Sequence, residues 1–384
     1  MPLLRALFLP LPLALLPALA PAQPAARPGA DADKLKAVPA AMQKFVDEGE
    51  LSGAVTVVGR KGGVLALDAV GQRDIGAKAP MTKDTLFRIA SMTKPVTAIG
   101  IMILADEGKL SPDDDVAKHL PEFTDQQRRL SGTGPSLTKP QRPVKLRDLL
   151  THTSGIMSAI PPVPPDVLMD IRKVTAFACG LPLESQPGER VNYSILLGHS
   201  IIAALCLEAD GRGRSYAQML KDEVFGPLGM KDTSLGLRPD LAKRFCPVRV
   251  SYDDLPALLP PAAVEGIGAL LAMPGGELPG GGCVSTVQDV LRFAEMLRRG
   301  GELDGVRLFS PLTVNKFTTP QSPADQPILR GLGWDIDSPF SGNRGDLFPI
   351  GSFGHTGFTG TGTLTPLISI CPDQAPAART TAPA

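Results

Sequence analysis

The chain has 384 residues and a formal net charge of zero, with 39 basic and 39 acidic side chains. Because no basic excess is present to neutralise phosphates, we expect no binding of nucleic acid. Hydrophobic residues make up 43% of the sequence, beside 40 glycines and 39 prolines. This composition supplies a core and many loops, and it excludes a disordered or collagen-like chain but not an enzyme.

The beginning of the sequence is typical of a secretory signal. A single arginine precedes the short apolar run Ala6–Leu19, which three prolines interrupt. Such a run is too short to cross a bilayer, and small residues follow it just before Gln23. We expect a signal peptide over 1–22, a linker over 23–33, and a mature periplasmic or secreted protein without a membrane span.

The next segments predict one helix, one hairpin and a second, buried helix. Apolar residues at helical spacing predict an amphipathic helix over 34–49. Two β-branched runs, Ala54–Val58 and Val64–Val70, predict a hairpin because glycines separate them. The run Val96–Leu104 is apolar around its whole circumference, which places this helix inside a domain.

The middle of the sequence is helical, after a Gly/Pro-rich loop at 131–143. Helical patterns lie at about 146–151, 166–178, 194–208 and 215–225. A capping box of Ser285 with Gln288 predicts a helix ending near Arg299, and Ser310–Pro311 opens another. Strand-like segments return at Gly333–Ile336, Ser352–Gly357 and Thr361–Ile370. This order predicts an α/β domain over 34–370, with one sheet built from both chain ends and a helical insertion at about 91–270.

Metal and cofactor sites lack the spacing that they need. The four histidines are far apart and show neither HxH nor HExxH spacing, which argues against a zinc hydrolase. The run Asp113-Asp114-Asp115 has no calcium-loop pattern and is predicted to form a solvated turn. No phosphate-binding glycine motif is present, and the five scattered cysteines are expected to be buried single thiols. We expect neither a metal nor a cofactor.

Three serines are candidate nucleophiles. Ser200 follows Gly198-His199, but Ile202 stands where a nucleophile elbow requires glycine, so Ser200 is expected to be structural. Two Ser-x-x-Lys motifs remain, beginning at Ser91 and Ser136. Only Ser91 stands directly before a helix, where Lys94 one turn later shares its face and unbonded N–H groups can stabilise an oxyanion. Ser91 is therefore the candidate.

A serine hydroxyl becomes a good nucleophile when a base takes its proton. Lys94 can serve as that base if burial or a neighbouring cation lowers its pKa toward neutrality. The predicted buried helix supplies the burial.

Several stretches together resemble one known family. They are LFRIASMTK at 86–94, Tyr193-Ser194 and the late His355-Thr356-Gly357, with further similar stretches at 149–155, 226–233, 280–286 and 331–334. Jointly they resemble the serine β-lactamase/penicillin-recognising superfamily, above all its class C-like branch, which includes β-lactamase-fold carboxylesterases. The resemblance covers roughly residues 35–365 and implies a β-lactamase/transpeptidase-like fold with an antiparallel sheet.

The resemblance also implies roles for individual residues. Ser91 would be acylated, Lys94 would accept its proton, and Tyr193, opening a helix, would act as partner base and acid. His355-Thr356-Gly357 would replace the family's Lys-Thr-Gly on the strand beside the site. The oxyanion would be bound by the backbone N–H groups of Ser91 and Phe358. By contrast, His152 in His152-Thr153-Ser154-Gly155 is interpreted as part of a helix end and turn.

Two departures from the family pattern concern the substrate. His355 has an ordinary pKa near 6.5 and would be mostly neutral at pH 7, so it anchors a carboxylate less well than a lysine. Ile195 stands where lactamases carry an asparagine for the acylamide of a β-lactam. We therefore expect a hydrolase of small neutral esters. A β-lactamase or D-Ala-D-Ala carboxypeptidase, and an inactive penicillin-binding-like protein, remain alternatives.

A third departure concerns the sequence after Thr361. Family members continue with another strand and a closing helix, whereas residues 371–384 are rich in alanine and proline and are expected to form a disordered tail. A frameshift and a lineage with a shorter end would both explain this ending. Without that partner, the helix at 34–49 is expected to expose apolar surface, and the chain to be of low stability.

Overall fold

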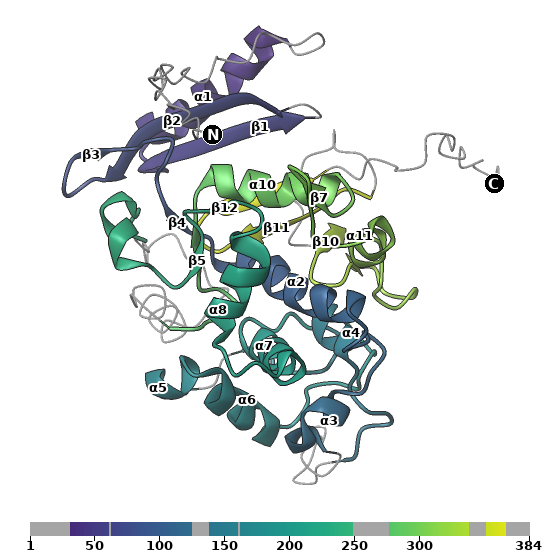
Figure 1. Ribbon diagram of the computed structural model, residues 1–384. Helices are drawn as coiled ribbons and strands as arrows, with labels where there is room; N and C mark the ends of the chain where they lie inside the picture. The colour runs from purple at the N-terminus through teal and green to yellow at the C-terminus, as the bar shows by residue number, and fades with distance from the viewer. Residues whose placement is uncertain are drawn as a thin grey trace, which may run out of the picture.

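The computed structural model describes residues 31–60, 63–124, 138–159, 162–248, 276–337 and 351–365. Figure 1 shows three layers of structure. The N-terminal hairpin and its helix form one end, and a group of helices forms the other. The C-terminal strands and helix α2 form the layer between these two ends. The predicted signal peptide and the tail at 371–384 lie outside the described residues. Among the described helices, none is long and apolar enough to cross a membrane.

Helix α1 (Ala32–Asp47) confirms the predicted amphipathic helix but begins two residues earlier, because Asp31 caps it. The Asp31 carboxylate accepts hydrogen bonds from the backbone N–H groups of Asp33 and Lys34 at 3.0 and 3.2 Å. The helix contacts β1 and β2, yet none of its residues is buried. Phe45 on this helix is 37% exposed, in agreement with the expected apolar surface.

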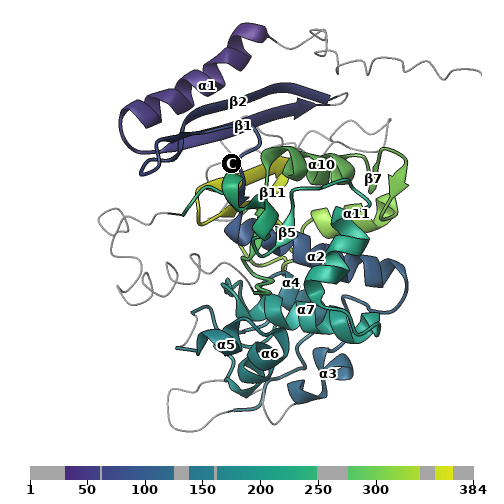
Figure 2. The ribbon, with the colours of Figure 1, turned by 60° about the vertical axis from the view of Figure 1, so that its left-hand side comes forward.

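The predicted hairpin is also confirmed. Strands β1 (Gly53–Arg60) and β2 (Gly63–Asp74) are antiparallel, and the short strand β3 (Ala79–Pro80) extends their sheet. Figure 2 shows α1 lying along one face of this hairpin, apart from the remaining strands.

Helix α2 (Thr93–Asp106) is the buried centre of the molecule. Every residue from Thr93 to Leu104 is buried, as predicted from the apolar circumference of this segment. A 3-10 turn, Ala90–Met92, leads into it. The main hydrophobic cluster extends from α2 to helix α7 (Leu197–Asp210), with which α2 packs.

The helical middle is confirmed with two changes of boundary. Its helices are α3 (Val116–His119), α4 (Leu146–Leu150), α5 (Pro165–Leu168), α6 (Ile171–Gly180), α7 and α8 (Tyr216–Leu220), the last continuing as a π-helical turn over Lys221–Phe225. The single helix predicted over 166–178 is two helices, because Asp170 caps α6. Helix α7 begins at Leu197, so Tyr193 precedes this helix instead of opening it. Most of the predicted loop at 131–143 lies outside the described residues.

The second half adds small sheets and two capped helices. Strands β4 (Phe87–Arg88), β5 (Ser234–Leu235) and β6 (Cys283–Ser285) form one sheet in the order β4-β6-β5, and β7 (Glu302–Leu303) pairs with β8 (Val306–Arg307). Helix α10 (Val287–Arg298) is capped by Thr286 and not by the predicted Ser285. Ser310 caps α11 (Pro311–Thr318), as predicted.

The C-terminal strands form an antiparallel sheet in the order β12-β11-β10-β9. These strands are β9 (Leu329–Arg330), β10 (Asp335–Asp337), β11 (Phe353–Gly357) and β12 (Thr361–Thr365). The predicted class, an α/β fold with antiparallel sheet and a helical middle, is confirmed. The predicted single sheet is divided within the described residues, where β1-β2-β3 and β12-β11-β10-β9 are separate ladders and helix α10 contacts both β1 and β12.

Candidate active site

Ser91 lies at the entrance to α2, where the chain turns sharply from β4 into the buried helix. The residue before it, Ala90, has a φ of 44°, a left-handed conformation that costs free energy for any residue with a Cβ atom. The Met92 N–H donates to the Ile89 carbonyl and closes the turn. Ser91 is half-buried, so its hydroxyl is held at the edge of the core.

Lys94 lies one turn after Ser91 and is completely buried. Its Nζ is 3.2 Å from Ser91 Oγ, 2.8 Å from the Ile195 carbonyl oxygen and 2.7 Å from the Gly280 carbonyl oxygen. Burial, reinforced by the positive charge of Arg330, lowers the pKa of Lys94 to about 7, and Asp335 acts in the opposite direction. A large fraction of Lys94 is therefore neutral at physiological pH.

The three contacts of Lys94 also fix the direction of its lone pair. A neutral amine has two N–H donors and one lone pair, and the two carbonyl oxygens can only accept. When both N–H groups donate to Ile195 and Gly280, the lone pair is left for the Ser91 hydroxyl. Neutral Lys94 is thereby oriented to accept the Ser91 proton.

Tyr193 completes the group around the serine. Its hydroxyl shares a side-chain hydrogen bond with Ser91, and Lys94 Nζ lies 4.9 Å from the centroid of its ring. Burial raises the pKa of Tyr193, so the phenol is protonated at neutral pH. The structure thus brings together Ser91, Lys94 and Tyr193, the three predicted catalytic residues.

His152 holds the Tyr193 segment in place. It follows α4 with a φ of 58°, in agreement with the predicted helix end and turn. Its ring stacks on Tyr193 with centroids 4.4 Å apart, and its Nδ1 accepts the Ser194 N–H at 3.1 Å. Burial keeps the pKa of His152 well below its usual value, so the ring is neutral and remains an acceptor. Sequence reasoning identified the turn but not this contact.

The end of β11 is fastened to the backbone just before Ser91. Thr359 Oγ1 donates to the Arg88 carbonyl at 2.6 Å, and Thr361 Oγ1 donates to the Ile89 carbonyl at 3.2 Å. A Cβ atom on Gly357 would lie 2.4 Å from the Ile89 oxygen, so only glycine allows this approach. The half-buried Thr356 and the exposed Phe358 therefore lie on the segment next to Ser91. Binding of an oxyanion by the N–H groups of Ser91 and Phe358 stays a prediction.

His355 points into the protein. Its side chain is 2% exposed, and its Nε2 lies 3.9 Å from the carboxylate of the buried Asp335. Nδ1 donates to the Thr356 carbonyl at 2.7 Å, and burial lowers the pKa of His355 to about 4. The imidazole is thus neutral at pH 7, as expected, but its contact with substrate stays a prediction.

The other sequence candidates take structural positions. Ser200 Oγ donates to the carbonyl of Leu196, the residue just before α7, whereas Ser136 lies outside the described residues. Asp114 binds Lys118 and His119 at the predicted surface turn.

In the described part of the chain, no group of histidine, cysteine, aspartate and glutamate side chains could hold a metal ion. Four cysteines there are free, and of these Cys246 is only half-buried, contrary to expectation.

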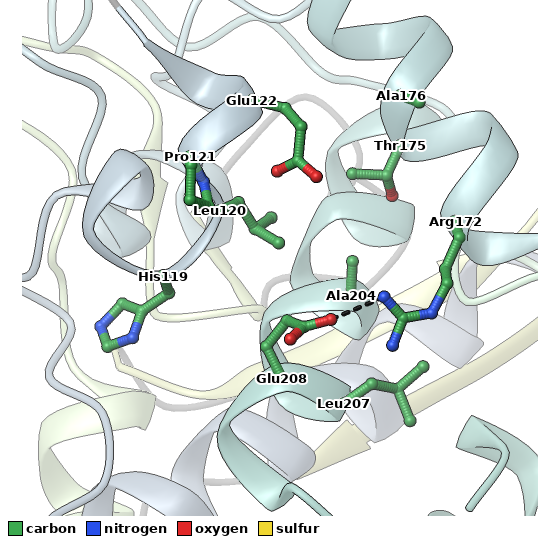
Figure 3. A pocket seen from close by; sticks show the side chains of 10 residues that line it. All are labelled: His119, Leu120, Pro121, Glu122, Arg172, Thr175, Ala176, Ala204, Leu207 and Glu208. Atoms are coloured by element: carbon green, nitrogen blue, oxygen red, sulfur yellow. Dashed lines mark hydrogen bonds and ion pairs between the residues drawn. The ribbon is translucent and has the colours of Figure 1, made fainter. Parts of the chain in front are cut away.

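A cavity of about 300 Å³ lies elsewhere, among the helices of the middle subdomain (Figure 3). Its lining comes from α3 and the turn after it, from α6 and from α7, and it includes Arg172, paired with Glu208 at 2.7 Å. The lining contains none of the predicted site residues, so this cavity is separate from the site at Ser91.

Comparisons with known proteins agree with this geometry. A sequence profile described as Beta-lactamase matches residues 38–370. The chain belongs to the beta-lactamase family. It is 35% identical over 331 residues to Protein Rv1367c of Mycobacterium tuberculosis, covering 80% of this chain and 76% of that protein. It is 30% identical over 360 residues to Esterase EstB of Burkholderia gladioli, covering 83% of this chain and 85% of that protein.

Solved structures share the fold of this beta-lactamase family protein. A family VIII carboxylesterase superposes with a TM-score of 0.69 at 23% identity, covering 87% of this chain and 88% of that one. The arrangement of β4, the entrance to α2 and the C-terminal sheet is therefore the beta-lactamase/transpeptidase-like fold that the sequence motifs predicted.

Proposed function

We propose that this protein is a serine hydrolase that forms an acyl-enzyme on Ser91 and acts on small neutral carboxylic esters. The observation that carries the proposal is the set of three contacts around Lys94, which leaves its lone pair to the Ser91 hydroxyl. Membership of a family that contains a protein named an esterase supports it.

In the proposed reaction, Ser91 Oγ attacks the ester carbonyl carbon while its proton passes to Lys94 Nζ. The bond from carbon to the leaving oxygen then breaks, and the alcohol departs with a proton supplied through Tyr193, which touches Ser91. Water hydrolyses the acyl-enzyme by the reverse sequence of proton transfers. Each proton accepted is returned, so the enzyme ends in its starting state.

The preference for esters rests on the polar groups near Ser91. Ile195 offers its carbonyl to Lys94 and has an apolar side chain, which cannot hydrogen-bond an acylamide. His355 is neutral and buried, so it supplies no exposed positive charge for a substrate carboxylate. Both features favour a neutral acyl group over a β-lactam.

The test compares p-nitrophenyl butyrate with nitrocefin, and Ser91→Ala with the wild type. We expect faster cleavage of the ester, loss of at least about 10³-fold in Ser91→Ala, and a single fluorophosphonate adduct on Ser91 by mass spectrometry. The labelling rate should rise with pH through about 7, as Lys94 loses its proton. Faster cleavage of nitrocefin would contradict the ester preference, and an unlabelled Ser91 would favour an inactive binding protein.

We also propose export, on the basis of the apolar run Ala6–Leu19. Fractionation of cells that produce the full chain should place it outside the cytoplasm with a new N-terminus near Gln23. A cytoplasmic product that keeps its first residues would refute export without affecting the proposed chemistry.

A further inference from the structure

A buried ion pair lies behind the candidate active site. The Arg330 guanidinium pairs with the Asp335 carboxylate, and the side chains of both are at most 2% exposed. The two residues face each other across the β9–β10 ladder, where their Cα atoms are partners. Sequence reasoning noted the stretch Gly331–Trp334 between them but neither charged residue. Burying two charges this deeply costs desolvation free energy, so the pair is a candidate for a role beyond stability. Its position relative to Ser91, Lys94 and Tyr193 shows what that role is.

The hairpin that carries Arg330 is fixed on three sides. The Gly333 N–H donates to the Leu150 carbonyl, and the Leu332 N–H donates to the Phe317 carbonyl. A Cβ atom on Gly333 would lie 2.4 Å from the Ala98 side chain, so the hairpin tip packs directly on α2. The guanidinium therefore has little freedom to move relative to the helix that bears Lys94.

Arg330 faces the reacting groups. Its guanidinium carbon lies 5.6 Å from the centroid of the Tyr193 ring, the same ring that Lys94 Nζ approaches to 4.9 Å. In the described residues, two of its nitrogens, Nε and Nη2, have no hydrogen-bond partner, so only part of its charge is engaged by Asp335. A cation near the face of an aromatic ring is attracted to it and acts through space on its neighbours.

The other titratable groups around Lys94 carry no charge at neutral pH. His152 and His199, which come from the turn after α4 and from α7, have pKa values well below the usual range because they are buried. His355 on β11 is neutral for the same reason, and Tyr193 keeps its proton. Among the described residues around Lys94, Arg330 and Asp335 are therefore the two fixed charges that act on its amine.

We propose that Arg330 is a positioning residue that supplies the fixed positive charge of this site, with Asp335 holding its guanidinium against Tyr193. The charge of Arg330 destabilises the ammonium form of Lys94 and keeps the amine available to Ser91. Asp335 acts in the opposite direction and limits this effect. The role in catalysis rests on the proposed function, whereas the electrostatic coupling does not.

The coupling is tested by direct titration of Lys94 in protein labelled with ¹³C at the lysine ε-carbon, with the signal assigned from a Lys94→Arg variant. This readout requires no substrate and no activity. Removing both charges in Arg330→Gln/Asp335→Asn should move the Lys94 titration to higher pH, because Arg330 has the larger effect. Asp335→Asn alone should move it to lower pH. A residue that only stabilises the fold would not shift the titration in opposite directions.

Arg330→Lys is the matched control, since it keeps the charge and the partner of Arg330. We expect its Lys94 titration to stay near that of the wild type. If Arg330→Lys and the double variant shift Lys94 equally, or if neither Asp335→Asn nor the double variant shifts it, the assignment is overturned. Should the double variant not fold, as judged by near-ultraviolet circular dichroism, Asp335→Asn still gives a signed test.

Fluorophosphonate labelling then connects the coupling to the reaction. The pH at which Ser91 labelling reaches half its maximal rate should follow the Lys94 titration in each variant. If wild-type Ser91 is never labelled while the titrations shift as expected, the proposed function fails and the coupling stands. If labelling is normal and the titrations do not move, the coupling fails and the proposed function stands.

Discussion

Lys94 shows how one buried side chain links stability to chemistry. Its amine is buried at the end of a four-carbon stem among carbonyl oxygens, and its pKa falls from 10.5 to about 7. Between these two values, the unfolded chain binds a proton that the folded chain does not bind. The free energy of unfolding therefore rises with pH across this window and loses the contribution again as pH falls toward 7.

A Lys94→Met variant provides the reference for this prediction. The stability of the wild type relative to Lys94→Met should rise by up to about 1.4 kcal/mol per pH unit between about 7 and 10, and be level below about 7. The carbonyls of Ile195 and Gly280 do not titrate, so the free energy lost with their hydrogen bonds in Lys94→Met does not depend on pH. Urea unfolding of both proteins at several pH values measures the difference. A difference independent of pH would mean that Lys94 is charged in the folded protein.

At the scale of elements, the site depends on the seam between β11 and the turn before α2. The hydroxyls of Thr359 and Thr361 bind the carbonyls of Arg88 and Ile89, and Gly357 allows the two backbones to approach. Because Ser91 follows this seam directly, a displacement of β11 changes the space in front of its hydroxyl. We therefore expect the contacts of this seam to fix the position of β11 relative to the Ser91 hydroxyl.

Gly357→Ala should open this seam, since its Cβ atom would lie 2.3 Å from Thr361 Oγ1 and 2.4 Å from the Ile89 oxygen. We expect a fall in the Ser91 labelling rate of about 10²-fold, as for a misplacement of about 1 Å. Gly362→Ala is the control, because its Cβ atom on the neighbouring strand would meet only ordinary contacts at 3.9 Å. Equal labelling of the two variants would show that the seam does not position Ser91.

The sequence could predict elements that depend on neighbouring residues, but not contacts between distant segments such as those at this seam. Local signals identified the helix after Ser91, the hairpin near the N-terminus and the cap at Ser310, because each depends on neighbouring residues. The motif resemblance brought Tyr193 and β11 to the site. The carbonyls of Ile195 and Gly280, and the pair Arg330–Asp335, carry no local signal. Their roles arise only when distant segments meet, which spacing in one sequence does not encode.

At the scale of the whole molecule, burial is unevenly distributed. Helix α2 is buried along nearly its whole length, whereas α1 has no buried residue and lies on a hairpin whose sheet is separate from the C-terminal sheet in the described residues. Local opening is easiest where few apolar contacts are lost. The N-terminal layer is therefore expected to open at a lower free energy than the central helices.

Hydrogen exchange followed by mass spectrometry measures this difference. Peptides from α1 should exchange at least about 10²-fold faster than peptides from α2 and α7, because their opening requires no disruption of the main core. Urea should release the N-terminal layer before the global transition. Equal protection of α1 and α2, together with one cooperative transition, would contradict the predicted low stability of this layer.

The two carbonyl contacts of Lys94 have a practical consequence for work with this protein. The amine is oriented only when the segments around Ile195 and Gly280 have both docked on α2, so under the proposed mechanism an unfolded or partly docked chain has no directed base for its serine. The burst of covalent labelling at saturating probe therefore counts correctly assembled molecules, and active-site titration can serve as a quality measure for each preparation.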